Sequence, residues 1–258
     1  MNALEKMIAH KRREIQANKM KIKSLPSFAR GSAGCRDFKK AISRPGRISV
    51  IAELKRRSPS AGLLIRVYDP AGIARVYEDG GAGALSVLTD QRFFGGTATD
   101  LVQAKRSVGI PVMRKDFIID DSQVLESFLL GADCILLIAR ALGPMALARF
   151  VDQAKKLGMA SLVEIHDRHD LEWTLTCGAD IIGVNNRDLT DFSVDIRTAL
   201  ELKPMIPADC VTVCESGIRS GDDVAKIRDA GFDAVLVGEA LMRSPRVRNK
   251  MQELICAR

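Results

Sequence analysis

IAELKRRSPS, residues 51–60, places two opposite charges at the end of an apolar segment. The stretch starts inside the apolar run 49–54, which is typical of a buried β-strand. Successive side chains of a strand point to opposite faces, so Glu53 and Lys55, two residues apart, point to the same side. Because it is costly to remove either charge from water, this pair indicates a site rather than ordinary core.

The same arrangement recurs along the chain. The apolar runs 111–113, 160–163, 180–184 and 211–214 lead into Lys115, Glu164, Asn185 and Glu215, respectively. Several strands that end in polar, reactive groups indicate one shared site at one end of a sheet.

Strand-like and helix-like segments alternate from residue 49 onward. Apolar runs lie near residues 50, 84, 111, 134, 161, 181, 211 and 235, and helical patterns occupy 70–78, 98–107, 122–130, 144–157, 168–177, 196–203 and 220–230. The runs are continuous rather than alternating, which is typical of parallel strands buried on both faces. Eight such units favour a closed barrel. An open doubly wound sheet usually has a glycine-rich turn after its first strand, where this chain has KRRSPS.

We therefore predict an α/β fold, a single (β/α)8 TIM barrel domain over residues 1–258 with an N-terminal helical extension. Residues 1–47 would form this extension over the barrel mouth. Within it we expect a helix at 3–19, a loop containing Pro26, Gly31 and Gly34, and a short helix at 37–42.

Positive charge is concentrated at the N-terminus. Residues 1–50 hold 13 Lys and Arg and 3 Asp and Glu, a net +10, so the other 208 residues of this +7 chain carry −3. The segment lacks aromatic residues interleaved for base stacking. This favours a solvated amphipathic helix whose field attracts an anionic substrate over a nucleic-acid-binding arm.

The sequence offers no sign of export or of a metal centre. No apolar run is long enough to cross a membrane, and the first residues lack the apolar core of a signal peptide. The six cysteines form no C-x-x-C pair and have no histidine at metal-binding spacing. We expect reduced thiols, no metal, no membrane partner and a cytoplasmic location.

In a (β/α)8 barrel the active site lies at the carboxyl ends of the strands. The residues predicted to converge there are Glu53, Lys55, Lys115, Glu164, Asn185, Arg187, Glu215 and Ser216. Salt bridges that plug the barrel would be the structural alternative. Because ionisable groups from so many strand ends meet, we favour catalysis.

The last two strands lead into Ser216-Gly217 and Gly238-Glu239. Barrels often bind phosphate at these loops, where glycine lets backbone N–H groups approach and a short helix favours an anion. Alternatively, the glycines only form tight turns. The Glu239 carboxylate would repel phosphate, so we expect its side chain to point away.

These motifs resemble the indole-3-glycerol phosphate synthase family. The matching stretches are residues 51–60, 86–90, 114–120, 131–138, 162–167, 183–189, 215–218 and 236–242. The resemblance implies ring closure of 1-(2-carboxyphenylamino)-1-deoxyribulose 5-phosphate to indole-3-glycerol phosphate, with loss of carbon dioxide and water, in tryptophan biosynthesis. It implies no cofactor and a small anionic substrate as the partner, and we expect a monomer or weak homodimer.

The resemblance also implies roles for individual residues. Lys115 would be the general acid that protonates the ribulose carbonyl, and Glu164 and Lys55 would serve later proton transfers. Glu53 and Glu215 would hold and tune the lysines. A lysine can act as an acid near neutral pH if burial or a neighbouring cation lowers its pKa, and we expect such tuning here.

Substrate contacts follow from the same resemblance. Asn185 would bind hydroxyls and Arg187 would support the site. The phosphate loops would comprise Ser216, Gly217, Gly238 and Glu239, joined by Lys55 and Ser58. The candidates for an apolar wall are Phe94, Leu136 and Leu137, and for the two leucines a core role is an equal alternative.

Other interpretations remain open. A phosphoribosyl anthranilate isomerase would show a Cys and an Asp at strand ends 1 and 5, where this chain has Glu53, Lys55 and Glu164. A thiazole synthase would form a Schiff base through a lysine, and a non-catalytic scaffold would not need Lys115. His166 could be a proton shuttle, but we favour a loop residue beside a helix-capping neighbour.

Overall fold

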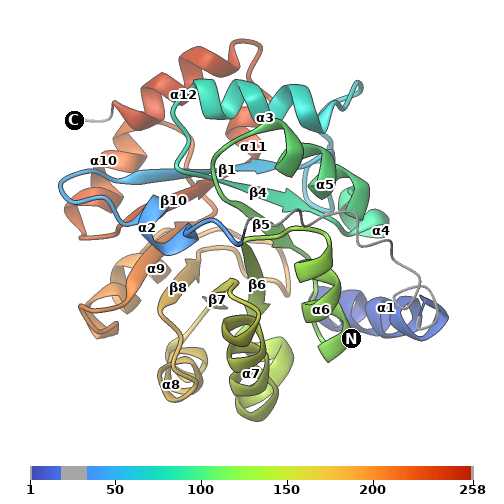
Figure 1. Ribbon diagram of the computed structural model, residues 1–258. Helices are drawn as coiled ribbons and strands as arrows, with labels where there is room; N and C mark the ends of the chain where they lie inside the picture. Colours follow the sequence, from blue (N-terminus) through green and yellow to red (C-terminus); the bar gives the residue numbers. More distant parts are fainter. Residues whose placement is uncertain (1, 19–33, 257–258) are drawn as a thin grey trace.

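The computed structural model describes residues 2–18 and 34–256, in which eight parallel strands close into a barrel (Figure 1). The strands are β1 (Ser49–Leu54), β4 (Ala84–Leu88), β5 (Val112–Lys115), β6 (Cys134–Ile138), β7 (Ala160–Ile165), β8 (Ile181–Asn185), β9 (Val211–Glu215) and β10 (Ala234–Val237). Each pairs with its neighbour in the sequence, and β1 closes the barrel by pairing with β10. The predicted (β/α)8 barrel is confirmed.

Helices surround the barrel (Figure 1). They are α3 (Pro70–Asp79), α5 (Ala98–Ser107), α6 (Asp121–Leu129), α7 (Ala139–Lys156), α8 (Arg168–Thr176), α9 (Arg197–Leu202), α10 (Gly221–Asp229) and α12 (Val247–Ile255). The predicted helices agree with these to within two residues except in α7. That helix starts earlier but is broken at Gly143 (φ 70°, ψ 170°), so its regular part after Pro144 matches the prediction.

Helix starts follow from capping side chains. Thr97, Asp120 and Ser220 each form a reciprocal capping box at the start of α5, α6 and α10. These side chains satisfy backbone N–H groups that have no partner within the helix. The sequence therefore fixes locally where the chain turns from the barrel rim into a helix.

Short elements in the loops were not predicted. They are the hairpin β2 (Arg57–Ser58) and β3 (Gly62–Leu63), the helices α4 (Gln91–Phe94) and α11 (Glu239–Met242), and the 3-10 turn η2 (Lys203–Met205). Each is too brief to show a periodic pattern. The hairpin, α4 and α11 all lie after strand ends and help to build the barrel mouth.

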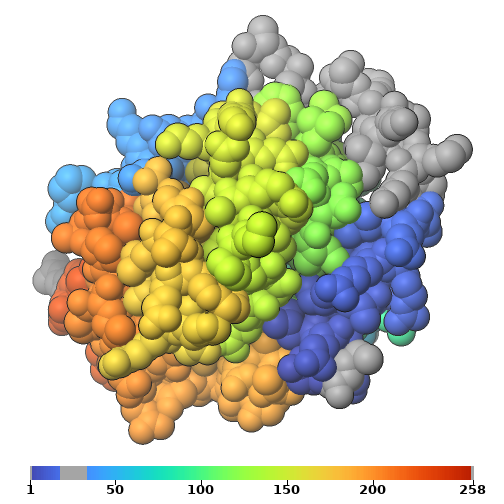
Figure 2. All heavy atoms as spheres, turned by 90° about the horizontal axis from the view of Figure 1, so that it is seen from below, coloured from blue at the N-terminus to red at the C-terminus, as the bar shows by residue number. Residues whose placement is uncertain are grey.

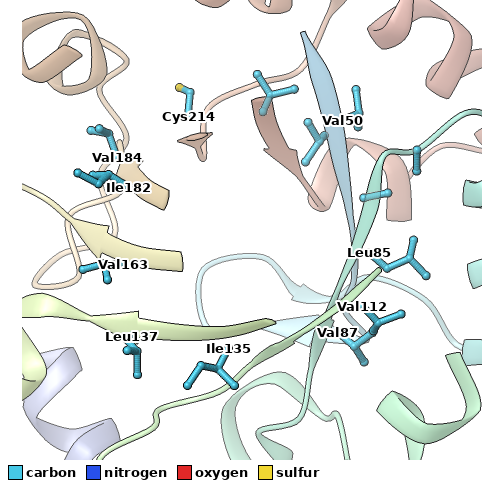
Figure 3. Packing of buried hydrophobic residues seen from close by; sticks show 14 of the residues in the cluster. Val50, Leu85, Val87, Val112, Ile135, Leu137, Val163, Ile182, Val184 and Cys214 are labelled. Carbon is cyan, nitrogen blue, oxygen red and sulfur yellow. The ribbon is translucent and has the colours of Figure 1, made fainter. Parts of the chain in front are cut away.

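Each strand has one face toward the helices and one toward the barrel axis. In β1, Val50 and Leu54 belong to the outer core, whereas Ile51 belongs to the inner one. Figure 3 shows outer-core side chains on the barrel strands, among them Val50, Leu85 and Val112. The alternation places Glu53 on the inner face with Ile51, which is why a carboxylate can end a buried strand.

The N-terminal segment lies against the barrel. Helix α1 (Ala3–Asn18) and the short α2 (Phe38–Ile42) occupy the predicted positions, whereas the expected loop around Pro26 and Gly31 lies outside the described residues. Leu4, Met7 and Ile8 of α1 share a buried cluster with Phe117 and other barrel residues. Figure 2 shows α1 (blue) packed beside green and orange segments.

No helix within residues 2–18 and 34–256 combines the length and the apolar character needed to cross a membrane. All six cysteines are thiols.

Candidate active site

A cavity of about 470 Å³ opens at the carboxyl ends of the barrel strands. All the predicted site residues except the alternative Leu137 line it: Glu53, Lys55, Ser58, Phe94, Lys115, Leu136, Glu164, Asn185, Arg187, Glu215, Ser216, Gly217, Gly238 and Glu239. They come from strand ends far apart in the sequence, and barrel closure brings them to one place.

The Lys115 ammonium lies between two carboxylates. Its Nζ is 2.8 Å from Glu215 Oε2 and 3.3 Å from Glu164 Oε2. Both glutamates are almost completely buried, at 1% and 2% side-chain exposure, whereas the lysine retains 15%. Lys115 therefore reaches into the cavity from a floor of acidic groups.

The carboxylates reverse the pKa shift expected for this lysine. Burial by itself would lower the pKa of Lys115, but Glu215, Glu164 and Glu53 outweigh it and raise that pKa. The expectation of a lowered pKa was wrong because the attraction of three carboxylates exceeds the effect of burial. Lys115 is therefore held as an ammonium ion.

The pKa values of the two glutamates beside Lys115 are shifted in opposite directions. Burial would raise the pKa of Glu164, but Lys115 and His166 outweigh it and the pKa is lowered. Burial raises the pKa of Glu215 to about 7, against the pull of Lys115 and with the help of the nearby Glu164 and Glu53 charges. Three carboxylates, from Glu53, Glu164 and Glu215, thus lie close to the two ammonium groups of Lys55 and Lys115.

Glu53 and Lys55 form an ion pair through Oε2 and Nζ. Gly238 makes the room for this pair, since a Cβ atom there would lie 2.2 Å from Glu53 Oε2 and 3.1 Å from Lys55 Nζ. Because Gly238 has no Cβ atom, the Glu53 and Lys55 side chains can approach its backbone closely, in addition to any turn that the glycine forms. The prediction that Glu53 and Lys55 point to the same side is confirmed.

The turn after β9 is bent in an unusual way. Ser216 and Gly217 both have positive φ, at 65° and 83°. A non-glycine residue in this conformation is uncommon and occurs mostly where the surroundings demand it. Two successive left-handed residues curve the backbone around the cavity edge.

Glu239 lines the cavity and is paired with an arginine. Its Oε1 lies 3.1 Å from Nε of Arg243, one helical turn further along, and both side chains are largely exposed. Arg219, Arg243 and Lys250 also line this side of the cavity. The region around the two turns is therefore cationic despite the carboxylate.

The opposite wall is apolar. Phe94 and Phe117 lie with their ring centroids 6.3 Å apart, and Leu136 faces the cavity beside them. Leu137 points outward into the core between strands and helices. The alternative of a core role is therefore correct for this residue. Phe117 was not predicted, although it follows Lys115 by two residues.

The polar residues of the rim hold each other in place. Arg187 donates from Nη1 to the Phe192 carbonyl at 3.0 Å and lies 3.4 Å from Ser60 Oγ. Asn185 accepts from the Arg187 backbone N–H at 3.0 Å. Ser58 accepts from the Ala61 backbone N–H at 3.1 Å, which closes the turn of the β2–β3 hairpin.

Sequence reasoning missed the contribution of α1. Met7 lines the cavity, and Lys11, only 2% exposed, pairs with Asp90 at 3.1 Å and Asp116 at 2.9 Å. One basic residue of the N-terminal segment is therefore buried against the site rather than solvated. The Asp-rich ends of β4 and β5 were the available signal, but nothing in the sequence says which lysine meets them.

His166 also differs from expectation. Its neighbour Asp167 does cap α8, but the imidazole itself is buried against Glu164. The spacing of two residues along β7 was a weak signal for this contact.

Comparisons with known proteins show one family over nearly the whole chain. The family model described as indole-3-glycerol phosphate synthase matches residues 4–254. A relative of that name from Chlorobium phaeovibrioides (strain DSM 265 / 1930) is 46% identical over 252 residues, 96% of this chain and 98% of the relative. Another, from Chloroherpeton thalassium (strain ATCC 35110 / GB-78), is 48% identical over 254 residues, covering 96% and 97%.

Solved structures share the fold at much lower identity. The N-acetylmannosamine-6-phosphate 2-epimerase from Clostridium perfringens has a TM-score of 0.62 at 17% identity, covering 83% of this chain and 95% of that one. Thiamine phosphate pyrophosphorylase from Pyrococcus furiosus has a TM-score of 0.60 at 16% identity, covering 80% and 93%. These likenesses concern the barrel alone, whereas the whole-length sequence match shows that this chain belongs to the indole-3-glycerol phosphate synthase family.

Proposed function

We propose that the protein converts 1-(2-carboxyphenylamino)-1-deoxyribulose 5-phosphate into indole-3-glycerol phosphate, carbon dioxide and water, in tryptophan biosynthesis. The observation that carries this proposal is the Lys115 ammonium between Glu164 and Glu215 at the base of a cavity with an apolar wall. Family membership over residues 4–254 supports it.

Lys115 is the acid of the first step. A carbon–carbon bond forms between the aromatic ring and the ribulose carbonyl carbon, and the carbonyl oxygen takes the proton from Nζ. The raised pKa of Lys115 keeps it charged, so the proton is present on Nζ when the carbonyl oxygen gains negative charge. The same charge makes it a poor nucleophile, which argues against a Schiff base with the carbonyl.

The later steps need proton transfers at the opposite side of the new bond. The ring carboxylate leaves as carbon dioxide, and its bonding electrons restore the aromatic ring. The new hydroxyl then takes up a proton and leaves as water, and the carbon beside the nitrogen loses a proton as the carbon–carbon double bond of the indole forms. We assign these proton transfers to Glu164 and Lys55, because both line the same cavity as Lys115. Glu53 and Glu215 hold the two ammonium groups.

The substrate carries two anionic ends. Its phosphate binds at the turns of Ser216-Gly217 and Gly238-Glu239, with Lys55 and Ser58 nearby. Arg187 supports the carboxylate end, and Asn185 binds the hydroxyls between them. The aromatic ring packs against Phe94 and Leu136.

We further propose that residues 1–47 act as an extension of this single domain that covers the barrel mouth. The burial of Lys11 and the place of Met7 in the cavity wall support this. The enzyme works in the cytoplasm as a monomer or weak homodimer, and its six cysteine thiols suit a reducing compartment.

The test is a direct assay of the purified protein with the carboxyphenylamino-deoxyribulose phosphate. Indole fluorescence should rise, and mass spectrometry should show a product lighter by one carbon dioxide and one water. Substrate that binds but is recovered unchanged would contradict the proposal. Sodium borohydride added during turnover should leave no substrate attached to the protein.

A further inference from the structure

His166 contacts Glu164 and does not itself line the cavity. It is the first residue after β7, its side chain is only 4% exposed, and it is not among the described residues that line the cavity. It therefore cannot touch the substrate without rearrangement. Any effect it has on the reaction must pass through Glu164.

The imidazole is enclosed by two carboxylates. Nε2 lies 3.2 Å from Glu164 Oε1, and Nδ1 lies 3.5 Å from Asp170 Oδ2. These are ion-pair distances rather than short hydrogen bonds. A neutral imidazole has one N–H group, so both contacts are attractive only when the ring is an imidazolium ion with two.

Asp170 is itself fixed in place. Its Oδ2 accepts from the backbone N–H of His166 and from Nε of Arg140, each at 2.9 Å. Arg140 also donates to Asp167 at 2.7 Å. The far side of the imidazole thus rests on a carboxylate that is held by α7, α8 and the end of β7.

The Nε2 side of the His166 ring faces Glu164 and determines how that carboxylate is held. Oε1 of Glu164 faces His166, whereas Oε2 faces Lys115 at 3.3 Å. Each oxygen of this buried carboxylate therefore has its own cationic neighbour. When Lys115 gives its proton away, His166 is the cation that remains beside Glu164.

We propose that His166 is a positioning residue: as an imidazolium braced by Asp170, it holds Oε1 of Glu164 and keeps Oε2 directed toward Lys115 and the substrate throughout turnover. This inference rests on the proposed function for the identity of the reaction. The interaction between His166 and Glu164 can also be measured when the reaction is not known.

The charged groups around the ring favour the protonated form. Burial by itself would lower the pKa of His166, and so would Arg140 on α7. Asp170 on α8 and Glu164 on β7 outweigh both and raise the pKa to about 9. His166 then stays charged at neutral pH and loses its proton only in alkaline solution.

Kinetics of three variants test the role. His166→Ala should lower kcat by up to about 100-fold with little change in KM, because Glu164 is misplaced while the binding groups remain. His166→Gln keeps a donor but not the charge, so it should restore part of kcat. Wild-type activity should fall near pH 9 as His166 loses its proton, and this fall should be missing in His166→Gln. His169→Ala, on the exposed start of α8 beside Trp173, is the matched control and should behave as wild type.

A measurement on the resting protein separates the two proposals. The chain has three histidines, and comparison with His166→Gln assigns the imidazole signal of His166 in a nitrogen-15 spectrum. We expect both ring nitrogens protonated at pH 7.5 and titration near pH 9. A neutral ring at pH 7.5, or normal kcat in His166→Ala, would overturn the inference even if the wild type is active. A charged ring in a wild type that makes no indole product would instead refute the proposed reaction.

Discussion

Lys11 of α1 places its ammonium 2.9 Å from Asp116, the residue that follows Lys115 in the sequence. Asp116 also accepts from Thr89 Oγ1 at 2.6 Å and from Arg114 at 3.1 Å. The N-terminal helix is therefore joined to the chain segment that carries the proposed acid. The packing of α1 on the barrel and the geometry of the site therefore depend on the same buried charges of Lys11 and Asp116.

Replacing Lys11 with Met should destabilise the protein. The substitution leaves Asp90 and Asp116 buried with fewer cationic partners, and breaking a buried pair in this way costs about 3–5 kcal/mol. Urea denaturation measures the change. Lys6→Met, at an exposed position on the same helix, should stay within about 0.5 kcal/mol of wild type. Equal stability of the two variants would mean that the Lys11 contacts contribute little.

Asp116 should make the protein sensitive to acid. Burial would raise its pKa, but Arg114 and Lys11 outweigh that and hold the pKa at about 2, below the ordinary 3.8. A depressed folded-state pKa gives stability that is present above pH 4 and disappears as the pH falls from about 4 to 2, in total about 2 kcal/mol. In Asp116→Asn this part of the pH dependence should vanish. An unchanged slope in the variant would show that other carboxyl groups dominate.

Gly238→Ala should damage the site although glycine carries no functional group. Its Cβ atom would lie 2.2 Å from Glu53 Oε2, so the Glu53–Lys55 pair must move. Overpacking of this kind costs about 1–3 kcal/mol, and kcat/KM should fall by at least about tenfold as Lys55 is displaced. Gly34→Ala, where no atom lies within 4 Å of the added Cβ, is the control. Wild-type kinetics in Gly238→Ala would argue against any role for that pair.

Glu239→Gln should have little effect on phosphate binding. The carboxylate is paired with Arg243 at the surface, and exposed pairs contribute about 0–1 kcal/mol. Inhibition by inorganic phosphate, measured in the variant and the wild type, should therefore differ by less than about threefold. A tenfold gain in phosphate affinity would show that the glutamate charge acts on the site after all.

The barrel and the meeting of charged residues at its strand ends could be predicted because they depend on local pattern. Continuous apolar runs identify buried parallel strands, and the two-residue repeat of a strand places Glu53 and Lys55 together. Once a barrel is assumed, its closure requires that Lys115, Glu164 and Glu215 meet. None of these steps needs information about distant contacts.

The sign of the Lys115 pKa could not be predicted in the same way. It depends on how close three carboxylates from β1, β7 and β9 approach one ammonium group, and burial acts in the opposite direction. The partners of Lys11 and His166 are hidden for a similar reason. Each contact joins side chains whose distances depend on how helices dock on the barrel, and a sequence pattern carries no such distances.

The central claim is that Lys115 donates the proton that accompanies ring closure. Lys115→Met removes the ammonium and keeps much of the side-chain volume, so substrate binding measured by calorimetry should persist. Indole fluorescence after mixing with substrate should then fall by at least about 1,000-fold in rate relative to wild type, since general acid catalysis contributes about 100- to 10,000-fold. A variant that binds substrate normally and retains most of its turnover would contradict the account.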